Sequence, residues 1–189
     1  KSGVACCQLA LAFGYKVILS EISSDKEIDL ELHDDLYIEK GMHSEKLLSC
    51  DFIVISPGIP SSIQIVKKAV ERGISIIGEI EFASWFAKSD ILAVTGSNGK
   101  STTCMMLHNI LLDAGYNSLL GGNIGIPFSN NVLIEINSKK KNTVHVLELS
   151  SFQIESLKKF KSKISCILNI SEDHLDRYKS MDFRFKLLQ

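Results

Sequence analysis

The sequence lacks the features that mark several broad classes of protein. No run of about 18 consecutive apolar residues occurs, so no segment is expected to insert into a membrane. No secretory signal is visible either. Neither sign of charge dominates, because 21 Lys and Arg residues stand against 22 Asp and Glu residues, for a net charge of −1. This balance gives no electrostatic argument for a nucleic-acid partner.

Paired cysteines are also lacking. The five cysteines are odd in number and form no C-x-x-C pair, and their spacing offers no cluster of zinc ligands. Each lies in or beside an apolar segment, which predicts small buried side chains in a reducing, cytoplasmic setting. They are Cys6, Cys7, Cys50, Cys104 and Cys166.

The most informative stretch is the segment Asp90–Thr103. An apolar run of strand length leads into Gly96-Ser97-Asn98-Gly99-Lys100-Ser101-Thr102, and helical periodicity follows. Glycines allow backbone N–H groups to surround a phosphate at a helix N-terminus, while Lys100 supplies charge and the Ser101 hydroxyl can ligate magnesium. The common P-loop pattern has a further glycine where Val94 stands, so the match is to a shorter form. A nucleotide triphosphate site is predicted; a glycine-rich turn between any strand and helix is the alternative.

Short apolar strands alternate with amphipathic helices along the chain, which predicts an α/β fold with mainly parallel strands. The pattern restarts near residue 89, so we expect two domains, residues 1–89 and 90–189. A helix over residues 3–13 followed by a strand ending at Glu21 resembles the back half of a dinucleotide-type βαβ unit. The first strand of that unit is then expected to precede residue 1, in a chain truncated at its N-terminus.

Three strands of the second half are followed by polar residues, which lie together if the strands are neighbours. A carboxylate such as Glu148, inside an apolar strand, is costly to bury unless a cation compensates it. Among the histidines, His174 is favoured as a site residue over a surface residue, whereas His108 and His145 are expected to be structural. Spacing alone favours Asp173 over His174 as a magnesium ligand. The polar clusters are 96–102, 148–151 and 169–177.

The helix that follows the glycine-rich segment is expected over residues 102–114. Its buried side is predicted to consist of apolar residues at helical spacing, which core packing explains without a cofactor. These residues are Met105, Met106, Ile110 and Leu111.

Six motifs occur in the order found in the Mur ligases, and the sequence resembles that family over essentially its whole length. Two of them, the second glycine-rich segment and the Ser-Ser-Phe-Gln segment, favour the branch that adds D-glutamate. The motifs are Ser56-Pro57-Gly58-Ile59-Pro60, Gly78-Glu79-Ile80-Glu81-Phe82, Thr95–Thr103, Gly121-Gly122-Asn123-Ile124-Gly125, Leu147-Glu148-Leu149-Ser150-Ser151-Phe152-Gln153 and Asp173-His174-Leu175-Asp176-Arg177.

The resemblance implies a cytoplasmic, monomeric, ATP- and Mg²⁺-dependent carboxylate–amine ligase of peptidoglycan synthesis. It would join D-glutamate to UDP-N-acetylmuramoyl-L-alanine through an acyl phosphate. A sibling Mur ligase, a folylpolyglutamate-type ligase and a nucleotide-binding fragment without turnover are the alternatives. Residues 1–89 would form a Rossmann-like domain for the UDP-substrate, and residues 90–189 an incomplete P-loop ATPase domain. The family's C-terminal domain is expected to be absent, and the chain alone is then expected to bind nucleotide weakly and not to ligate.

The family's motifs also imply roles for individual residues. For the magnesium ligand they favour His174, in place of Asp173, which spacing alone favours. The implied magnesium ligands are Ser101, Glu148 and His174. The implied ATP-binding residues are Gly96, Ser97, Asn98, Gly99, Lys100, Ser101 and Thr102. The implied substrate-binding residues are Ser2, Gly3, Glu21, Asn123 and Ser150. The implied catalytic residues are Lys100, His174 and Lys186. Lys186 is the candidate for the carbamylated lysine of the family. It lies twelve residues after His174, whereas the family places this lysine slightly further from the histidine.

Overall fold

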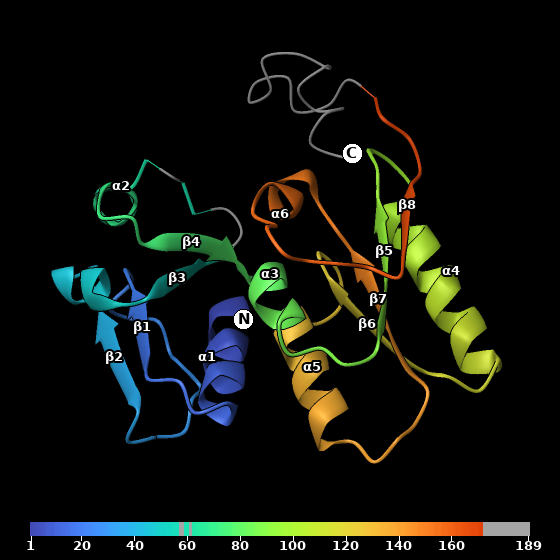
Figure 1. Cartoon of the computed structure of the whole chain (residues 1–189), viewed down its shortest axis with the longest axis horizontal. Helices are drawn as coiled ribbons and strands as arrows, with labels where there is room; N and C mark the ends of the chain where they lie inside the picture. Colours follow the sequence, from blue (N-terminus) through green and yellow to red (C-terminus); the bar gives the residue numbers. More distant parts are fainter. Residues whose placement is uncertain (57–58, 61, 172–189) are drawn as a thin grey trace.

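The computed structural model describes residues 1–56, 59–60 and 62–171, in which helices and strands alternate (Figure 1). The first half contains α1 (Ser2–Ala12), β1 (Val17–Glu21), β2 (Leu36–Lys40), the 3₁₀ helix η1 (Glu45–Ser49), β3 (Phe52–Ile55), α2 (Gln64–Glu71), β4 (Ser75–Gly78) and α3 (Glu79–Ser84). The second half contains β5 (Asp90–Thr95), α4 (Lys100–Asp113), β6 (Asn117–Gly122), α5 (Phe128–Asn137), β7 (Thr143–Glu148), α6 (Ser151–Glu155) and β8 (Ile164–Ile167).

All strand pairs of the described residues are parallel. In the first half, β1 pairs with β2 and β3 pairs with β4, as two separate two-stranded sheets. In the second half, four strands form one sheet in the order β6-β7-β5-β8. The predicted α/β class with mainly parallel strands is confirmed. In the described part of the chain, no strand pairing crosses from the residues before 89 to those after it.

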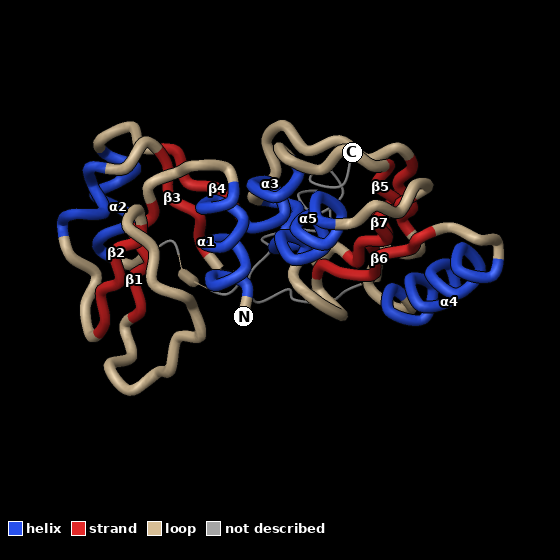
Figure 2. The backbone as a smooth tube through the Cα atoms, turned by 90° about the horizontal axis from the view of Figure 1, so that it is seen from below, coloured by secondary structure: helices blue, strands red, loops and turns tan. Residues whose placement is uncertain are grey.

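Three helices, α1, α3 and α5, lie between the two sets of strands and contact one another (Figures 1 and 2). A single hydrophobic core runs through this layer, and it includes Leu9 of α1, Phe82 of α3, Phe128 of α5 and Leu147 of β7, each at most 1% exposed. Because apolar side chains from both halves share this core, burial of apolar surface holds the halves together. None of the helices in the described residues is both long and apolar enough to cross a membrane.

The predicted buried side of α4 is wrong at three of its four residues and is confirmed only at Leu111. Met105, Met106 and Ile110 are 47%, 60% and 60% exposed. The helix instead contacts the sheet through a narrow stripe formed by Cys104, Leu107 and Leu111, with Cys104 fully buried. Residues three and four apart share a helix face, so this stripe turns the other apolar side chains outward.

The cysteine prediction is wrong at one position. Cys6, Cys7 and Cys104 are buried and Cys50 is half-buried, but Cys166 is exposed. Cys166 belongs to β8, which has a paired neighbour on one side only among the described strands. An apolar segment at the margin of a sheet therefore need not be buried.

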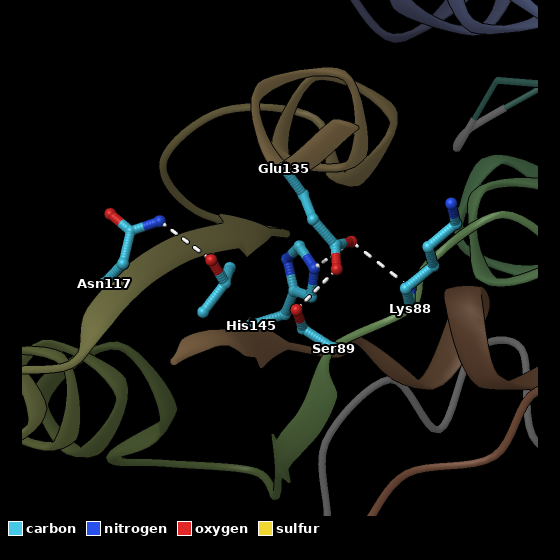
Figure 3. Close-up of polar contacts among 6 residues, drawn as sticks. Lys88, Ser89, Asn117, Glu135 and His145 are labelled. Carbon is cyan, nitrogen blue, oxygen red and sulfur yellow. Dashed lines mark hydrogen bonds and ion pairs between the residues drawn. The ribbon is translucent and has the colours of Figure 1, made fainter. Parts of the chain in front are cut away.

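His145 is structural, as expected, and joins the sheet to the segment that connects the two halves (Figure 3). Its ring lies on β7 with no exposed surface, and its Nε2 lies 3.0 Å from Glu135 Oε2 of α5. The same carboxylate accepts hydrogen bonds from the Lys88 backbone N–H, at 3.3 Å, and from the Ser89 hydroxyl. The rings of His145 and Phe128 pack in a T-shaped arrangement, with centroids 5.2 Å apart.

Burial lowers the pKa of His145 below its ordinary value of about 6.5, although the hydrogen bond and charge of Glu135 act in the opposite direction. The unfolded chain then takes up a proton at pH values where the folded chain keeps this imidazole neutral. The contribution of His145 to stability is therefore fully present above about pH 6.5 and is lost as the pH falls through the lowered pKa.

We expect the free energy of unfolding to fall between about pH 7.5 and pH 5.5, and to fall less steeply in a His145→Gln variant, which has no group to protonate there. Urea denaturation across this range measures the difference. His33→Gln removes an exposed histidine and should keep the wild-type slope. Equal slopes for His145→Gln and wild type would contradict the assignment.

Candidate functional site

The glycine-rich segment forms a loop between β5 and the N-terminus of α4. Gly99 has a φ of 84° as the residue before the helix, a conformation that glycine adopts without steric cost. Lys100 Nζ donates hydrogen bonds to the carbonyl oxygens of Gly96 and Ser97, at 2.8 and 2.9 Å. The ammonium group therefore lies over the loop, beside the positive end of a 14-residue helix.

Glu148 is the centre of the polar contacts at this edge of the sheet. It ends β7, between Val94 of β5 and Gly122 of β6, and is 1% exposed. Ser101 Oγ donates to its Oε2 at 2.7 Å, and Asn123 Nδ2 donates to its Oε1 at 2.6 Å. The structure thus brings together the three residues that the sequence predicts from separate segments.

The second glycine-rich segment is held directly against the end of β7. The backbone N–H of Asn123 donates to the carbonyl oxygen of Glu148 at 2.9 Å. Gly122 has a φ of 95°, and a Cβ placed on it would overlap that same carbonyl oxygen. Glycine at this position therefore lets the loop approach β7 closely enough to aim Asn123 at Glu148.

The donor set at this edge fits a magnesium ion. It consists of a hydroxyl, a carboxylate and an amide, and hard oxygen ligands are those that Mg²⁺ prefers. Within the described ranges, no three His, Cys, Asp or Glu side chains converge as a softer metal would require. Mg²⁺ commonly uses one or two protein carboxylates together with substrate phosphates, so Ser101 and Glu148 suffice as a protein contribution.

Asn169, the first residue of the polar cluster 169–177, lies against the loop of residues 96–99, as the sequence predicts for neighbouring strands. Its side chain makes two hydrogen bonds with the Asn98 backbone: Asn98 N–H donates to Oδ1 at 2.8 Å, and Nδ2 donates to Asn98 O at 2.9 Å. Its carbonyl accepts from Ser97 N–H at 3.0 Å. A polar residue directly after a strand that neighbours β5 was the available signal.

Ser150 and Thr102, two further predicted site residues, each lie at the start of a helix. Ser150 precedes α6 and forms a capping box with Gln153: the Ser150 hydroxyl accepts from Gln153 N–H, and the Gln153 side chain accepts from Ser150 N–H. Thr102 is exposed in the first turn of α4. Substrate binding by Ser150 and ATP binding by Thr102 stay predictions.

The residues predicted for the UDP-substrate lie in the first half. Ser2 and Gly3 begin α1, and a Cβ placed on Gly3 would lie 3.8 Å from atoms of Leu19 and Ser56, near the carboxyl ends of β1 and β3. Glu21 ends β1 and forms a 2.5 Å ion pair with Lys26. Its pKa is lowered by the hydrogen bond from Lys26 and by that from the Ser23 backbone.

Two predicted catalytic residues, His174 and Lys186, lie outside the described residues. The other predicted site residues all lie within the described part of the chain.

Two family models together match most of the chain. The model of the Mur ligase middle domain matches residues 94–185, and that of the Mur ligase MurD-like N-terminal domain matches residues 1–78. The chain belongs to the Mur ligase family. The two matches divide the chain near the place where the sheets of this Mur ligase separate.

Curated relatives of this Mur ligase carry the name UDP-N-acetylmuramoylalanine–D-glutamate ligase. The protein of Christiangramia forsetii is 40% identical over 181 residues, which is 94% of this chain and 40% of that protein. The protein of Cytophaga hutchinsonii is 42% identical over 184 residues, which is 95% of this chain and 40% of that protein. The chain thus spans about two fifths of the length of these relatives.

Solved structures support the fold. A murein peptide ligase from Psychrobacter arcticus matches 98% of this chain and 43% of its own, with a TM-score of 0.57 and 20% identity. The UDP-N-acetylmuramate:L-alanyl-gamma-D-glutamyl-meso-diaminopimelate ligase from Neisseria meningitides matches 99% of this chain and 63% of its own, with a TM-score of 0.57 and 18% identity. At these identities the likeness extends to the fold alone.

We expect an Asn169→Ala substitution to loosen the loop of residues 96–99, since it removes both side-chain hydrogen bonds to Asn98. Each such bond contributes about 1 kcal/mol, so the Asn98 amide should exchange its hydrogen roughly tenfold or more faster. Hydrogen exchange followed by NMR measures this rate. Asn109→Ala, which removes an exposed asparagine from α4, should leave it unchanged, and an unchanged rate in Asn169→Ala would refute the role.

Proposed function

We propose that this chain provides the UDP-substrate-binding and ATP-binding parts of a ligase that joins D-glutamate to UDP-N-acetylmuramoyl-L-alanine. The observation that carries the proposal is the buried Glu148 carboxylate, hydrogen-bonded to Ser101 and Asn123 beside the Lys100 loop. The names of the relatives that are about 40% identical supply the two substrates. The energy source that fits a phosphate loop is ATP with Mg²⁺.

In this proposal, residues 1–89 form a Rossmann-like domain and residues 90–189 a P-loop domain. Parallel strand pairing supports both assignments, with a helix between β3 and β4 and between successive strands of the second half. Ser2, Gly3 and Glu21 would bind the uridine nucleotide at the carboxyl ends of the first-half strands. The ATP phosphates would be bound by the loop and by the first turn of α4, through residues Gly96, Ser97, Asn98, Gly99, Lys100, Ser101 and Thr102.

The proposed reaction has two steps. A carboxylate oxygen of the alanine residue attacks the γ-phosphorus of ATP, ADP leaves, and an acyl phosphate forms. The amine of D-glutamate then attacks the acyl carbon, phosphate leaves, and the nitrogen loses a proton. Phosphoryl transfer depends on positioning and on neutralising charge, which the Lys100 ammonium and the loop N–H groups supply.

Ser101 and Glu148 would hold Mg²⁺, which neutralises charge on the β- and γ-phosphates when it is bound. Asn123 orients the Glu148 carboxylate and is proposed to lie near the substrate and the nucleotide. Ser150 is proposed to contact the substrate from the start of α6. His174 is proposed as a ligand of a second Mg²⁺ and Lys186 as the carbamylated lysine beside it. The proposed enzyme acts as a monomer in the cytoplasm.

We expect a Lys100→Ala variant to bind Mg·ATP at least about tenfold more weakly than the unaltered chain, because a charge-assisted hydrogen bond to phosphate contributes about 1.5–3 kcal/mol. Isothermal titration calorimetry measures the affinity, and thermal unfolding shows whether the fold is retained. Lys140→Ala removes an exposed lysine outside the loop and should bind Mg·ATP as tightly as the unaltered chain. An affinity near that of the unaltered chain in Lys100→Ala would mean that the loop has been misassigned.

Ligation itself is tested in a chimera in which this chain replaces the matching segment of the Christiangramia forsetii relative. The folded chimera should release phosphate from ATP only when both UDP-N-acetylmuramoyl-L-alanine and D-glutamate are present, and Lys100→Ala should abolish release. Turnover with a different amino acid would favour a sibling ligase. A folded chimera that binds ATP without forming product would favour a nucleotide-binding module.

A further inference from the structure

The motif Gly78-Glu79-Ile80-Glu81-Phe82 contains two buried carboxylates that the proposed reaction does not use. Glu79 is 3% exposed and Glu81 is fully buried, both in α3. A buried carboxylate is costly unless it is hydrogen-bonded, so the partners of each decide what it does. Both find their main partners in the second half of the chain.

Glu81 is bound by a row of backbone N–H groups. Its carboxylate accepts from Lys158 at 2.8 Å, from Lys159 at 2.9 Å and from Phe160 at 3.0 Å, and also from the Trp85 indole at 2.9 Å. Burial acts to raise the pKa of Glu81, but these hydrogen bonds outweigh it and lower the pKa. An ionised carboxylate of the first half thus holds the 158–160 segment of the second half.

Glu79 binds the start of α5. Its Oε1 accepts from the backbone N–H of Ser129 at 2.6 Å and from the Ser129 hydroxyl at 2.8 Å. Ser129 lies in the first turn of α5, where backbone N–H groups lack partners within the helix. Cys6 Sγ of α1 lies 3.5 Å from the same hydroxyl, so three helices meet at this point.

The remaining residues of the motif face the same junction. A Cβ placed on Gly78 would overlap the hydroxyl of Ser156, at the end of α6, so glycine allows the two halves to approach here. Ile80 and Phe82 are each 1% exposed in the core that both halves share. Gly78, Glu79 and Glu81 thus contact, or make room for, the other half, and Ile80 and Phe82 belong to the core that both halves share.

We propose that residues 78–82 form a joint that fixes the two halves at one relative angle, with Glu79 and Glu81 as positioning residues for ligation. The positioning part rests on the proposed function, in which each half binds a different substrate. Reacting atoms held about 1 Å out of place can lose about 100-fold in rate, so a fixed angle matters for the transfer. Backbone N–H donors suit this role because they have no side-chain torsions through which the contact can move.

The joint can be tested by pulsed electron paramagnetic resonance on the full 189-residue chain. Spin labels at Val70→Cys of α2 and Ile110→Cys of α4, both exposed, report the distance between the halves. Cys50→Ser and Cys166→Ser remove the cysteines that are not buried. The reference chain should give one narrow distance distribution, and Glu81→Ala a clearly broader or shifted one.

Matched variants separate the joint from a general loss of stability. Glu81→Gln should also broaden the distribution, because both oxygens of Glu81 accept N–H groups and the amide nitrogen of Gln can replace neither of them. Glu79→Gln should not, because only Oε1 of Glu79 accepts and the amide oxygen can take its place. Glu27→Ala, an exposed carboxylate, should behave as the reference. Amide exchange at residues 158–160 should rise roughly tenfold or more in Glu81→Gln.

Unchanged distance distributions and unchanged exchange in folded Glu81→Gln would overturn the joint. If the Glu81→Ala variant does not fold, the distance distribution and amide exchange of Glu81→Gln alone test the joint. Both measurements need no ligand, so they test the joint even if this chain fails to bind ATP. In the active chimera, Glu81→Gln should lower kcat and leave the KM for ATP unchanged. An equal rise in KM would overturn the positioning role, whereas an inactive chimera with a broadened distribution would contradict only the proposed function.

Discussion

Burial of the Glu148 carboxylate is the constraint on which the carboxyl edge of the large sheet depends. A charged group at the end of a central strand must be compensated, and here the compensation comes from both flanking strands: Ser101 follows β5 and Asn123 follows β6. Each of those residues is delivered by a glycine-containing turn. One electrostatic requirement therefore explains why two loops far apart in the sequence have the form they do.

Much of this site could be predicted because its determinants are local. A strand, two glycines, and Lys100 with Ser101 at the start of a helix specify a loop shape through backbone conformation alone. The parallel order of the strands then places Glu148 beside that loop. These steps need only the alternation of helices and strands and the rule that parallel strands end at one edge.

The errors arise where long-range packing decides. Met105, Met106 and Ile110 have helical spacing, but spacing fixes only which residues share a face, and it does not say which face meets the sheet. The cluster 169–177 was expected beside the loop, but the contacts of Asn169 itself were not, because its partners are the backbone atoms of Asn98, about seventy positions earlier in the chain, and sequence patterns do not display backbone partners. The burial of Glu79 and Glu81 was hidden for the same reason.

The contact between Glu81 and the 158–160 segment has a consequence for how this sequence can change. A carboxylate that binds main-chain N–H groups does not select among side chains, so a position such as Lys159 is free to vary in charge, size and polarity. The constraint falls on the backbone instead. Proline, the residue without an N–H group, is the substitution that this segment excludes.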